Sequence, residues 1–289
     1  MTVLITGSHG FVGTNLIEAL VPKYDVIRWN AREDKPLPNC DAVIHLAGIA
    51  QDSKVSEGKW KREDYYKVNT ELTKKIYVRF LESAAKKFIF FSSIKAKDAD
   101  TPYALSKLQA ELVIEEMDDV RRKKDKEVYI LRPCMIHGKG NKANFSLLLR
   151  WVNKGFPWPL AAFDNKRSYA SIENVCFVTA QLLKKEVKTG VYEVCDDEAV
   201  STNELIGLIG NVLGKKARMW YISQPMMTAF ARVGDWIHLP LNTERLRKLT
   251  TDYIIDNRKI KLALCIERLP VNAIEGLKHS ITCLMNKEE

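Results

Sequence analysis

Tyr103 and Lys107 lie four residues apart at the start of a predicted helix, so their side chains share one face of it. A tyrosine with its ordinary pKa of about 10 is a poor base at neutral pH. A cation beside the phenol stabilises the phenolate and lowers that pKa, which suits proton exchange with a substrate hydroxyl. Because Tyr-x-x-x-Lys spacing is common on surface helices, this pair indicates chemistry only in a suitable context.

Three glycines supply that context. Gly7, Gly10 and Gly13 stand between a predicted strand at residues 2–6 and a predicted helix that includes residues 15–20. The first permits a tight turn, the second lets the backbone approach a pyrophosphate, and the third allows close helix–strand contact. The helix N-terminus adds free N–H donors and positive potential. The segment predicts a dinucleotide-binding turn; a purely structural turn is the alternative.

The elements around these residues alternate between apolar strands and amphipathic helices. Strands are predicted at residues 2–6, 25–29, 41–46, 87–91, 128–131 and 190–195, and helices at 67–86, 104–119, 146–153, 173–186 and 203–214. This alternation predicts an α/β fold, a Rossmann-type doubly wound parallel sheet with a smaller α+β substrate-binding domain. The expected NAD(P)-binding domain comprises residues 1–138 and 172–196, and the second domain residues 139–171 and 197–289.

Two stretches fit this alternation poorly. Residues 31–40 contain two prolines and little apolar content, so we expect a loop where such sheets often add a strand and a helix. Residues 241–283 read as a mixture of short strands and helices. Met219, Met226 and Met227 are expected to fill gaps in the core.

The spacing GxxGxxG together with Tyr-x-x-x-Lys resembles the short-chain dehydrogenase/reductase superfamily. Further matches span the chain and resemble its extended branch, the NAD-dependent epimerases and dehydratases that modify nucleotide sugars. These matches are His45-Leu-Ala-Gly48, Asn69 in KVNTELT, Leu131-Arg-Pro133 with Ile136-His-Gly138, Arg167-Ser-Tyr-Ala-Ser-Ile172 and the terminal IEGLKHSI. His137 stands where that branch usually has tyrosine.

The resemblance assigns roles to individual residues. Ser93, Tyr103 and Lys107 become the catalytic group; Ser92 competes with Ser93, which the alignment of SSIKAK favours. Lys107 would also hold the nicotinamide ribose. The expected cofactor-binding residues are Gly7, His9, Gly10, Phe11, Val12, Gly13, Asn30, Arg32, Leu46, Ala47, Gly48, Asn69, Tyr103, Lys107 and Pro133. His9 is expected only to line the cofactor site. His45 is expected to be a core residue whose ring nitrogens find hydrogen-bond partners there.

The residues at the end of the second strand indicate whether the dinucleotide is NAD or NADP. An acidic residue there would accept the adenosine ribose hydroxyls of NAD. Asn30 occupies that position, and Arg28 and Arg32 flank it. An arginine there suits the 2′-phosphate of NADP, so this segment favours NADP over NAD.

The substrate side rests on Arg167, whose guanidinium can bind a diphosphate bidentately. The resemblance places this residue on the pyrophosphate of a UDP-sugar. Ser93, Asn144 and Arg150 complete the expected substrate-binding set, although Arg150 fits a solvated helix residue equally well.

Bulk properties exclude several classes of protein. No run of 18 apolar residues predicts a membrane span, and the N-terminus lacks signal-peptide character, so a cytoplasmic protein without a membrane partner is expected. Neither the six cysteines nor the five histidines show metal-ligand spacing, so no metal is predicted. The net charge of +9 is spread along the chain, which disfavours nucleic acid; the densest basic cluster, residues 121–126, is expected to be a solvated loop.

Two classes of function follow. The first is an NAD(P)-dependent nucleotide-sugar 4-epimerase or 4-keto reductase, working on a UDP-sugar as a homodimer, as the resemblance implies. Dehydration is disfavoured because Ile94 and Lys95 stand where dehydratases usually carry an acidic pair. The alternative is a non-catalytic NAD(P)-sensing protein on the same fold, which typically lacks the tyrosine or the lysine that this chain has.

Overall fold

The computed structural model describes residues 1–50, 60–141, 146–237 and 241–285, and the chain divides into two compact units. The first unit comprises Met1–Cys134, Asn174–Val194 and Asp256–Arg268, and the second comprises Met135–Glu173, Cys195–Ile255 and Leu269–Glu289. This division differs from the expected boundaries chiefly at residues 256–268. They belong with the first unit because α11 (Arg258–Leu264) packs beside β9 (Gly190–Val194).

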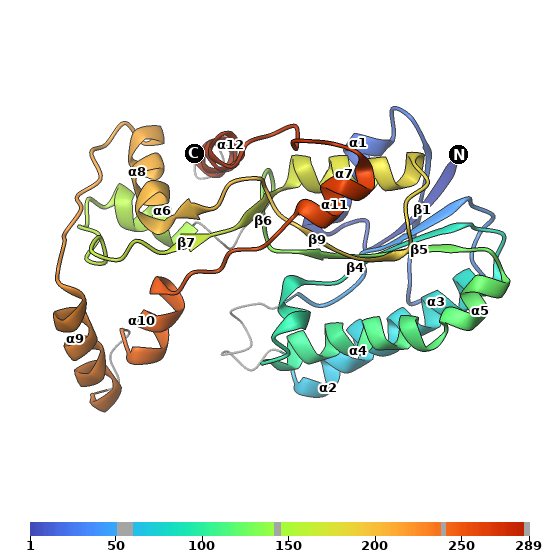
Figure 1. Ribbon diagram of the computed structural model, residues 1–289, viewed down its shortest axis with the longest axis horizontal. Helices are drawn as coiled ribbons and strands as arrows, with labels where there is room; N and C mark the ends of the chain where they lie inside the picture. Colours follow the sequence, from blue (N-terminus) through green and yellow to red (C-terminus); the bar gives the residue numbers. More distant parts are fainter. Residues whose placement is uncertain (51–59, 142–145, 238–240, 286–289) are drawn as a thin grey trace. The chain divides into compact units, whose positions relative to one another are not determined.

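A six-stranded parallel sheet forms the centre of the first unit and confirms the Rossmann-type α/β fold. Its strands run in the order β2 (Asp25–Trp29), β1 (Thr2–Thr6), β3 (Ala42–His45), β4 (Lys87–Phe91), β5 (Glu127–Pro133) and β9. Helices α1 (Phe11–Leu20) and α7 (Ile172–Lys184) lie over one face, and α3 (Leu72–Glu82) and α4 (Pro102–Glu116) over the other (Figure 1). Burial on both faces explains the continuous apolar runs of the strands.

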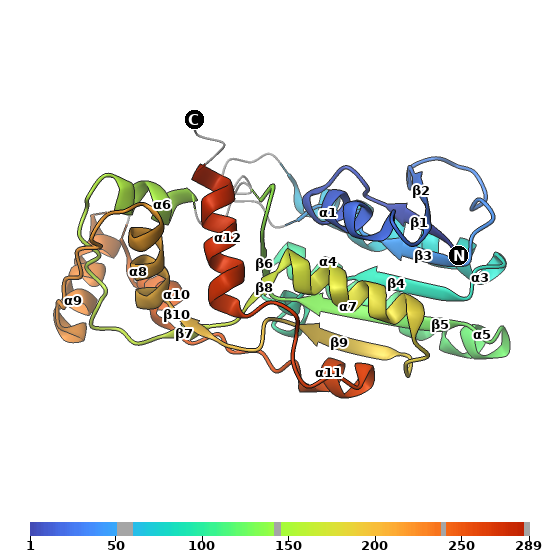
Figure 2. The same cartoon turned by 90° about the horizontal axis from the view of Figure 1, so that it is seen from above.

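Figure 2 shows the parallel strands of this sheet from above. Parallel strands present their carboxyl ends at one edge, where ligands of open α/β sheets bind. The residues that follow β1, β3, β4 and β5 are therefore brought to the same edge. This is how the glycine turn after β1 comes to lie beside Ala47 after β3.

β2 is the edge strand because residues 31–40 form a loop, as predicted. Arg79 of α3 ties this loop to the helix: its guanidinium donates to the Glu33 carbonyl at 2.9 Å and pairs with Asp34 at 2.5 Å. Lys75 also pairs with Asp34, at 2.9 Å. Asp34, in the loop after β2, is thus already paired with two cations of α3.

One helical run of the first unit changes its hydrogen-bonding pattern midway. α2 (Arg62–Tyr65) continues into a π-helical turn, η2 (Tyr66–Glu71), and then into α3. A helix was predicted from residue 67, but not the π turn within it. Such turns are rare and frequently occur at functional sites. Here the turn contains Asn69.

The basic cluster at residues 121–126 is helical for half its length, which corrects the predicted loop. α5 (Asp118–Lys123) includes Arg121, whose Nε lies 2.6 Å from Asp118. The Lys126 ammonium donates to the carbonyls of Ser83 and Ala85, at 2.8 and 2.6 Å. Arg121 and Lys126 therefore form ion pairs or hydrogen bonds within the fold.

The second unit contains two small sheets and five helices within the described residues. Its elements are β6 (Met135–His137), β7 (Lys166–Arg167), β8 (Tyr169–Ser171), β10 (Val200–Ser201), α6 (Ser146–Asn153), α8 (Thr202–Val212), α9 (Gln224–Trp236), α10 (Thr243–Thr250) and α12 (Ala273–Met285). β6 pairs with β8, β7 pairs with β10, and α8 and α12 share a buried apolar core. Between residues 241 and 285 the structure has the predicted helices but no strand, only an isolated bridge from Tyr253 to Arg167, so the predicted short strands were wrong.

Helix α9 departs from the expected pattern of burial. Met227, Ala231 and Gly234 face inward, while Met226 is 52% exposed and Phe230 53% exposed. The prediction that Met226 fills the core was therefore wrong, whereas Met227 is buried and Met219 packs against the core.

Candidate active site

The glycine turn between β1 and α1 leaves no room for side chains. Gly7 has φ +68°, and a Cβ built on it would lie 2.7 Å from the backbone nitrogen of Ala47. A Cβ on Gly13 would lie 2.4 Å from the Gly7 carbonyl oxygen. Gly10 is the N-cap of α1 without a side-chain cap, so the first N–H groups of the helix stay available. This cradle fits the diphosphate of a dinucleotide.

The predicted catalytic side chains converge at the carboxyl end of β4. Ser93 is the N-cap of the short helix η3 (Ile94–Lys97), and Tyr103 and Lys107 lie on the first two turns of α4. The Ser93 hydroxyl is hydrogen-bonded to Tyr103. The Lys107 ammonium donates to the Phe91 carbonyl at 2.8 Å, which fixes α4 against the end of β4. Ser92 instead donates to the carboxylate of Glu111, so Ser93 is the serine that faces Tyr103.

Asn69 joins the helical run to this group. Its Oδ1 accepts from the Ile49 N–H at 2.8 Å, and its Nδ2 donates to the Ile49 carbonyl and to the Ser106 hydroxyl, each at 3.0 Å. A Cβ on Gly48 would lie 2.9 Å from Asn69 Oδ1 and 3.3 Å from Lys107 Nζ. Gly48, Asn69 and Lys107 thus meet at one point, where the backbone stays open only because residue 48 is glycine.

Burial sets the protonation behaviour of the group. It lowers the pKa of Lys107 to about 8, against an opposing influence of the Glu111 charge, which raises it. Burial also raises the pKa of Tyr103, and the hydrogen bond from Ser93 counteracts that rise. Burial thus disfavours both the ammonium of Lys107 and the phenolate of Tyr103, while Glu111 favours the first and Ser93 the second.

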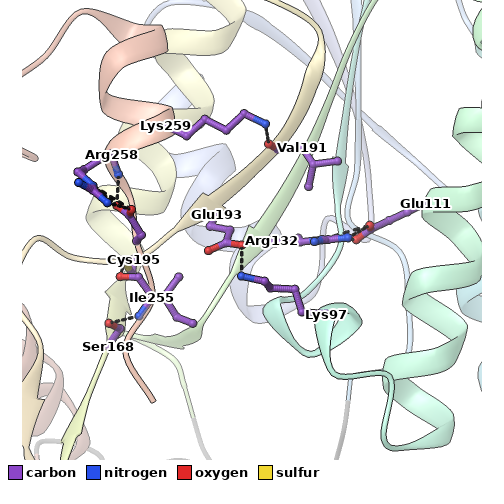
Figure 3. Close-up of polar contacts among 11 residues, drawn as sticks. Lys97, Glu111, Arg132, Ser168, Val191, Glu193, Cys195, Ile255, Arg258 and Lys259 are labelled. Carbon is purple, nitrogen blue, oxygen red and sulfur yellow. Dashed lines mark hydrogen bonds and ion pairs between the residues drawn. The ribbon is translucent and has the colours of Figure 1, made fainter. Parts of the chain in front are cut away.

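A row of alternating charges, formed by Glu111, Arg132, Glu193 and Lys97, links α4, β5, β9 and η3 (Figure 3). The Arg132 guanidinium on β5 makes a bidentate pair with Glu111 on α4, with Nε 3.0 and 3.1 Å from the two carboxylate oxygens. Lys97, at the end of η3, pairs with Glu193 of β9 at 2.8 Å. The Glu193 charge also raises the pKa of Arg132. These residues hold η3 and α4, the two elements that carry the candidate catalytic side chains.

The sequence analysis did not find this row. Glu111 could have been suspected, because it lies one helical turn after Lys107 on a face that is otherwise apolar. Its partner Arg132 lies 21 residues further along the chain, and only the pairing of β4 with β5 brings the two together.

The remaining cofactor residues lie around the same strand ends. Leu46 and Ala47 donate their N–H groups to the Thr6 hydroxyl, each at 3.2 Å. Pro133 is buried at the end of β5, Phe11 and Val12 start α1, and His9 is exposed in the glycine turn. Asn30 is exposed after β2, and its Oδ1 accepts from the N–H of Arg32, which is also exposed.

His45 is a core residue, as predicted. Its ring nitrogens lie 2.7 Å from the Thr6 hydroxyl and 3.1 Å from the Thr73 hydroxyl. Complete burial lowers its pKa to about 3, so the ring is neutral at physiological pH.

Within the second unit, Arg167 stands on β7 and is partly buried. Its Nε is fully buried and has no hydrogen-bond partner among the described residues. Arg150 is exposed on α6, which favours its alternative reading as a solvated helix residue. Asn144 lies outside the described residues.

His137, found in place of the usual tyrosine, is fully buried in the second unit. Its ring nitrogens lie 2.8 Å from the Ser280 hydroxyl and 3.3 Å from Asp196. Both Asp196 oxygens also accept from the Ser171 N–H, so the network braces β8 and α12. Across the described ranges, His, Cys, Asp and Glu form no group of three or more that could hold a metal ion.

Comparison with known proteins extends this picture. The NAD dependent epimerase/dehydratase family matches residues 3–195. A UDP-glucose 4-epimerase of Vibrio cholerae is 32% identical over 267 residues, covering 78% of this chain and 79% of that protein. An N-acetyl-alpha-D-glucosaminyl-diphospho-ditrans,octacis-undecaprenol 4-epimerase of Escherichia coli O157:H7 is 26% identical over 257 residues, covering 78% and 76%.

Among solved structures, a UDP-glucuronic acid 4-epimerase from Bacillus cereus in complex with NAD aligns over the whole of both chains, with a TM-score of 0.75 and 17% identity. At that identity the likeness establishes a shared fold. The family match and the Vibrio cholerae relative go further, since they cover most of the sequence. The chain therefore belongs to the NAD-dependent epimerase/dehydratase family of enzymes.

Proposed function

We propose that the protein is an NAD(P)-dependent 4-epimerase of UDP-sugars. The observation that carries this proposal is the convergence of Ser93, Tyr103 and Lys107 at the sheet edge that also holds the glycine cradle. The named activity of the Vibrio cholerae relative supports it. The complete catalytic group speaks against a non-catalytic sensor.

The proposed roles follow from the geometry. The turn at Gly7, Gly10 and Gly13 would hold a dinucleotide, which would supply a reversible hydride acceptor for C4 of the sugar. Tyr103 takes the proton from the hydroxyl on that carbon and later gives it back. Lys107 stabilises the phenolate, and Ser93 hydrogen-bonds the same substrate oxygen. Ile94 and Lys95 stand where dehydratases usually place an acidic pair, so neither position supplies an acid for dehydration.

A 4-keto-sugar reductase is the second candidate, because the adenosine side of the cradle is short. Residues 31–40 form a loop, and Asn30 replaces the acid that would bind the ribose of NAD. Fewer adenosine contacts favour faster release, which a reductase requires. The same features support NADP as a cofactor at least as good as NAD, with exposed Arg32 beside the 2′-phosphate.

Arg167 would bind the diphosphate group to which the sugar is attached. A buried guanidinium nitrogen without a partner fits a diphosphate, which UDP-sugars and polyprenyl-diphosphate sugars share. The lipid-linked form named for the Escherichia coli relative is the second substrate candidate. A homodimer is part of the proposal through the family resemblance.

One experiment separates these outcomes. The protein is desalted, its extracted nucleotides are identified, and UDP-glucose and UDP-glucuronic acid are supplied with NAD far below the substrate concentration. An epimerase converts many equivalents of sugar, because the hydride returns. A reductase converts a 4-keto-sugar only in proportion to added NAD(P)H. Conversion of neither class of substrate by well-folded protein would refute the proposal.

A further inference from the structure

Helix α9 carries two apolar faces. Met227, Ala231 and Gly234 repeat at helical spacing on the inward face, which is narrow and small. On the outward face Met226, Phe230, Val233 and Ile237 follow at intervals of four, three and four residues. Beside them Trp236 is 83% exposed. A helix that contacts only water presents polar residues on its outer face, so this one is built for a second contact.

The apolar surface continues next to the helix. Trp220 and Tyr221 precede α9 and are exposed, as is Leu249 on α10. Tryptophan and tyrosine are the residues enriched where a bilayer meets water, because one end of each ring system is apolar and the other polar. We call Met226, Phe230, Val233, Trp236 and Ile237 the α9 stripe.

Cations accompany the stripe. Residues 215–252 contain seven lysines and arginines against three acidic residues. All three acids are engaged: Asp235 accepts from the Thr243 N–H at 3.1 Å, Glu244 pairs with Lys248, and Asp252 accepts from the Lys166 N–H at 2.7 Å. Arg232 on α9 and Arg247 on α10 are exposed and form no ion pair with any residue that the structure describes.

We propose that α9 and α10 bind the surface of an anionic membrane. The α9 stripe would enter the boundary between headgroups and acyl chains, while Arg232 and Arg247 contact lipid phosphates. No helix in the described ranges is long and apolar enough to cross a bilayer, and the 13 residues of α9 suit a position in its plane. The expectation of no membrane partner rested on the lack of a span and of signal-peptide character, and neither bears on binding in the plane of a bilayer.

A second copy of the chain is the competing occupant. A symmetric interface would place the same excess of cations in residues 215–252 on both sides of the contact, where like charges repel. Apolar side chains, interfacial aromatics and unpaired cations on one short helical pair match an anionic bilayer better. The proposal does not depend on the sugar that the enzyme transforms.

The test is flotation of the purified full-length protein with phosphatidylcholine vesicles that contain about 30% phosphatidylglycerol, and with pure phosphatidylcholine vesicles. We expect binding to the anionic vesicles that weakens with salt. Phe230→Ser with Trp236→Ser should reduce that binding by about tenfold or more. Arg232→Gln with Arg247→Gln should weaken binding to the anionic vesicles alone.

Leu262→Ser is the matched control, because Leu262 is 76% exposed on α11 of the other unit. It should bind as the wild type does. Circular dichroism, and turnover of any sugar nucleotide accepted by the wild type, should be unchanged in every variant. Absence of vesicle binding by the wild type would overturn the proposal. So would a dimer, seen by light scattering, that dissociates when the α9 stripe is substituted.

Discussion

The carboxylate of Glu111 receives Arg132 in a bidentate pair, while its charge also acts on Lys107, one helical turn away. Glu111 is buried, and Ser92 donates a further hydrogen bond to it. A buried carboxylate with these partners keeps a fixed position. It is placed to hold charge on the ammonium that the proposed mechanism needs.

Glu111→Gln should therefore move the pH dependence of the enzyme. The Glu111 charge raises the pKa of Lys107, so its loss lowers that pKa below about 8. Activity that requires the ammonium falls as pH rises through this pKa, so the alkaline limb of kcat/KM should shift to lower pH. Glu115→Gln, on the exposed face of the same helix, is the control and should leave the profile in place. An unchanged alkaline limb in Glu111→Gln would remove this role.

Tyr103→Phe should fold normally, bind dinucleotide and lose turnover by roughly 10²- to 10⁴-fold, the usual share of general acid–base catalysis. Tyr77→Phe is the matched control, because Tyr77 is a buried tyrosine in the core of the same unit. It should retain activity. Turnover near the wild-type rate in Tyr103→Phe would exclude the phenol from the reaction.

Two glycine-to-alanine variants should have opposite outcomes: one should lose dinucleotide binding, and the other should gain stability. Gly13→Ala places a Cβ 2.4 Å from the Gly7 carbonyl oxygen, so the turn must shift and dinucleotide binding should be lost. Gly207→Ala adds a Cβ within α8 with nothing inside 4 Å, which should stabilise the fold by about 0.5–1 kcal/mol. Calorimetry with NAD and NADP measures the first effect and thermal unfolding the second. Normal dinucleotide affinity in Gly13→Ala would argue against the cradle.

Arg167→Ala should weaken UDP binding at least tenfold, since a hydrogen bond to a charged group contributes about 1.5–3 kcal/mol. Dinucleotide affinity should stay nearly unchanged, which separates the effect from misfolding. Arg150→Ala tests the alternative: an exposed, solvated arginine should alter UDP affinity little. Equal UDP affinities of wild type and Arg167→Ala by calorimetry would contradict the assignment.

Local pattern was enough to predict the strands. The apolar runs at residues 2–6 and 87–91 match β1 and β4, because a strand buried on both faces needs only continuous apolar residues. Residues 25–29 match β2, an edge strand in which only Trp29 is buried. Likewise, the charge and proline content of residues 31–40 predicted the loop. The choice of Ser93 over Ser92 agrees with the hydrogen bonds of the two hydroxyls, although its catalytic role stays a prediction.

Features that depend on tertiary pairing could not be predicted in this way. The π-helical turn at Asn69 has the composition of an ordinary helix, and its pattern is set by contacts with Ile49 and Ser106. Met226 and Met227 are adjacent apolar residues, and only the orientation of α9 decides which one is buried. Periodicity indicates that a helix has a face; it does not say what covers it.

The path of the chain has a consequence for its synthesis. The chain passes from one unit to the other at residues 134/135, 173/174, 194/195, 255/256 and 268/269. β5 pairs with β4 on one side and gains its second neighbour only when β9 has been made. Lys259 of α11 then donates to the Val191 carbonyl at 2.7 Å. On the ribosome, β5 is therefore an open sheet edge while some 60 further residues are translated, a state that invites pairing between nascent chains. Since neither unit is one contiguous segment of the chain, no single cut separates the two units.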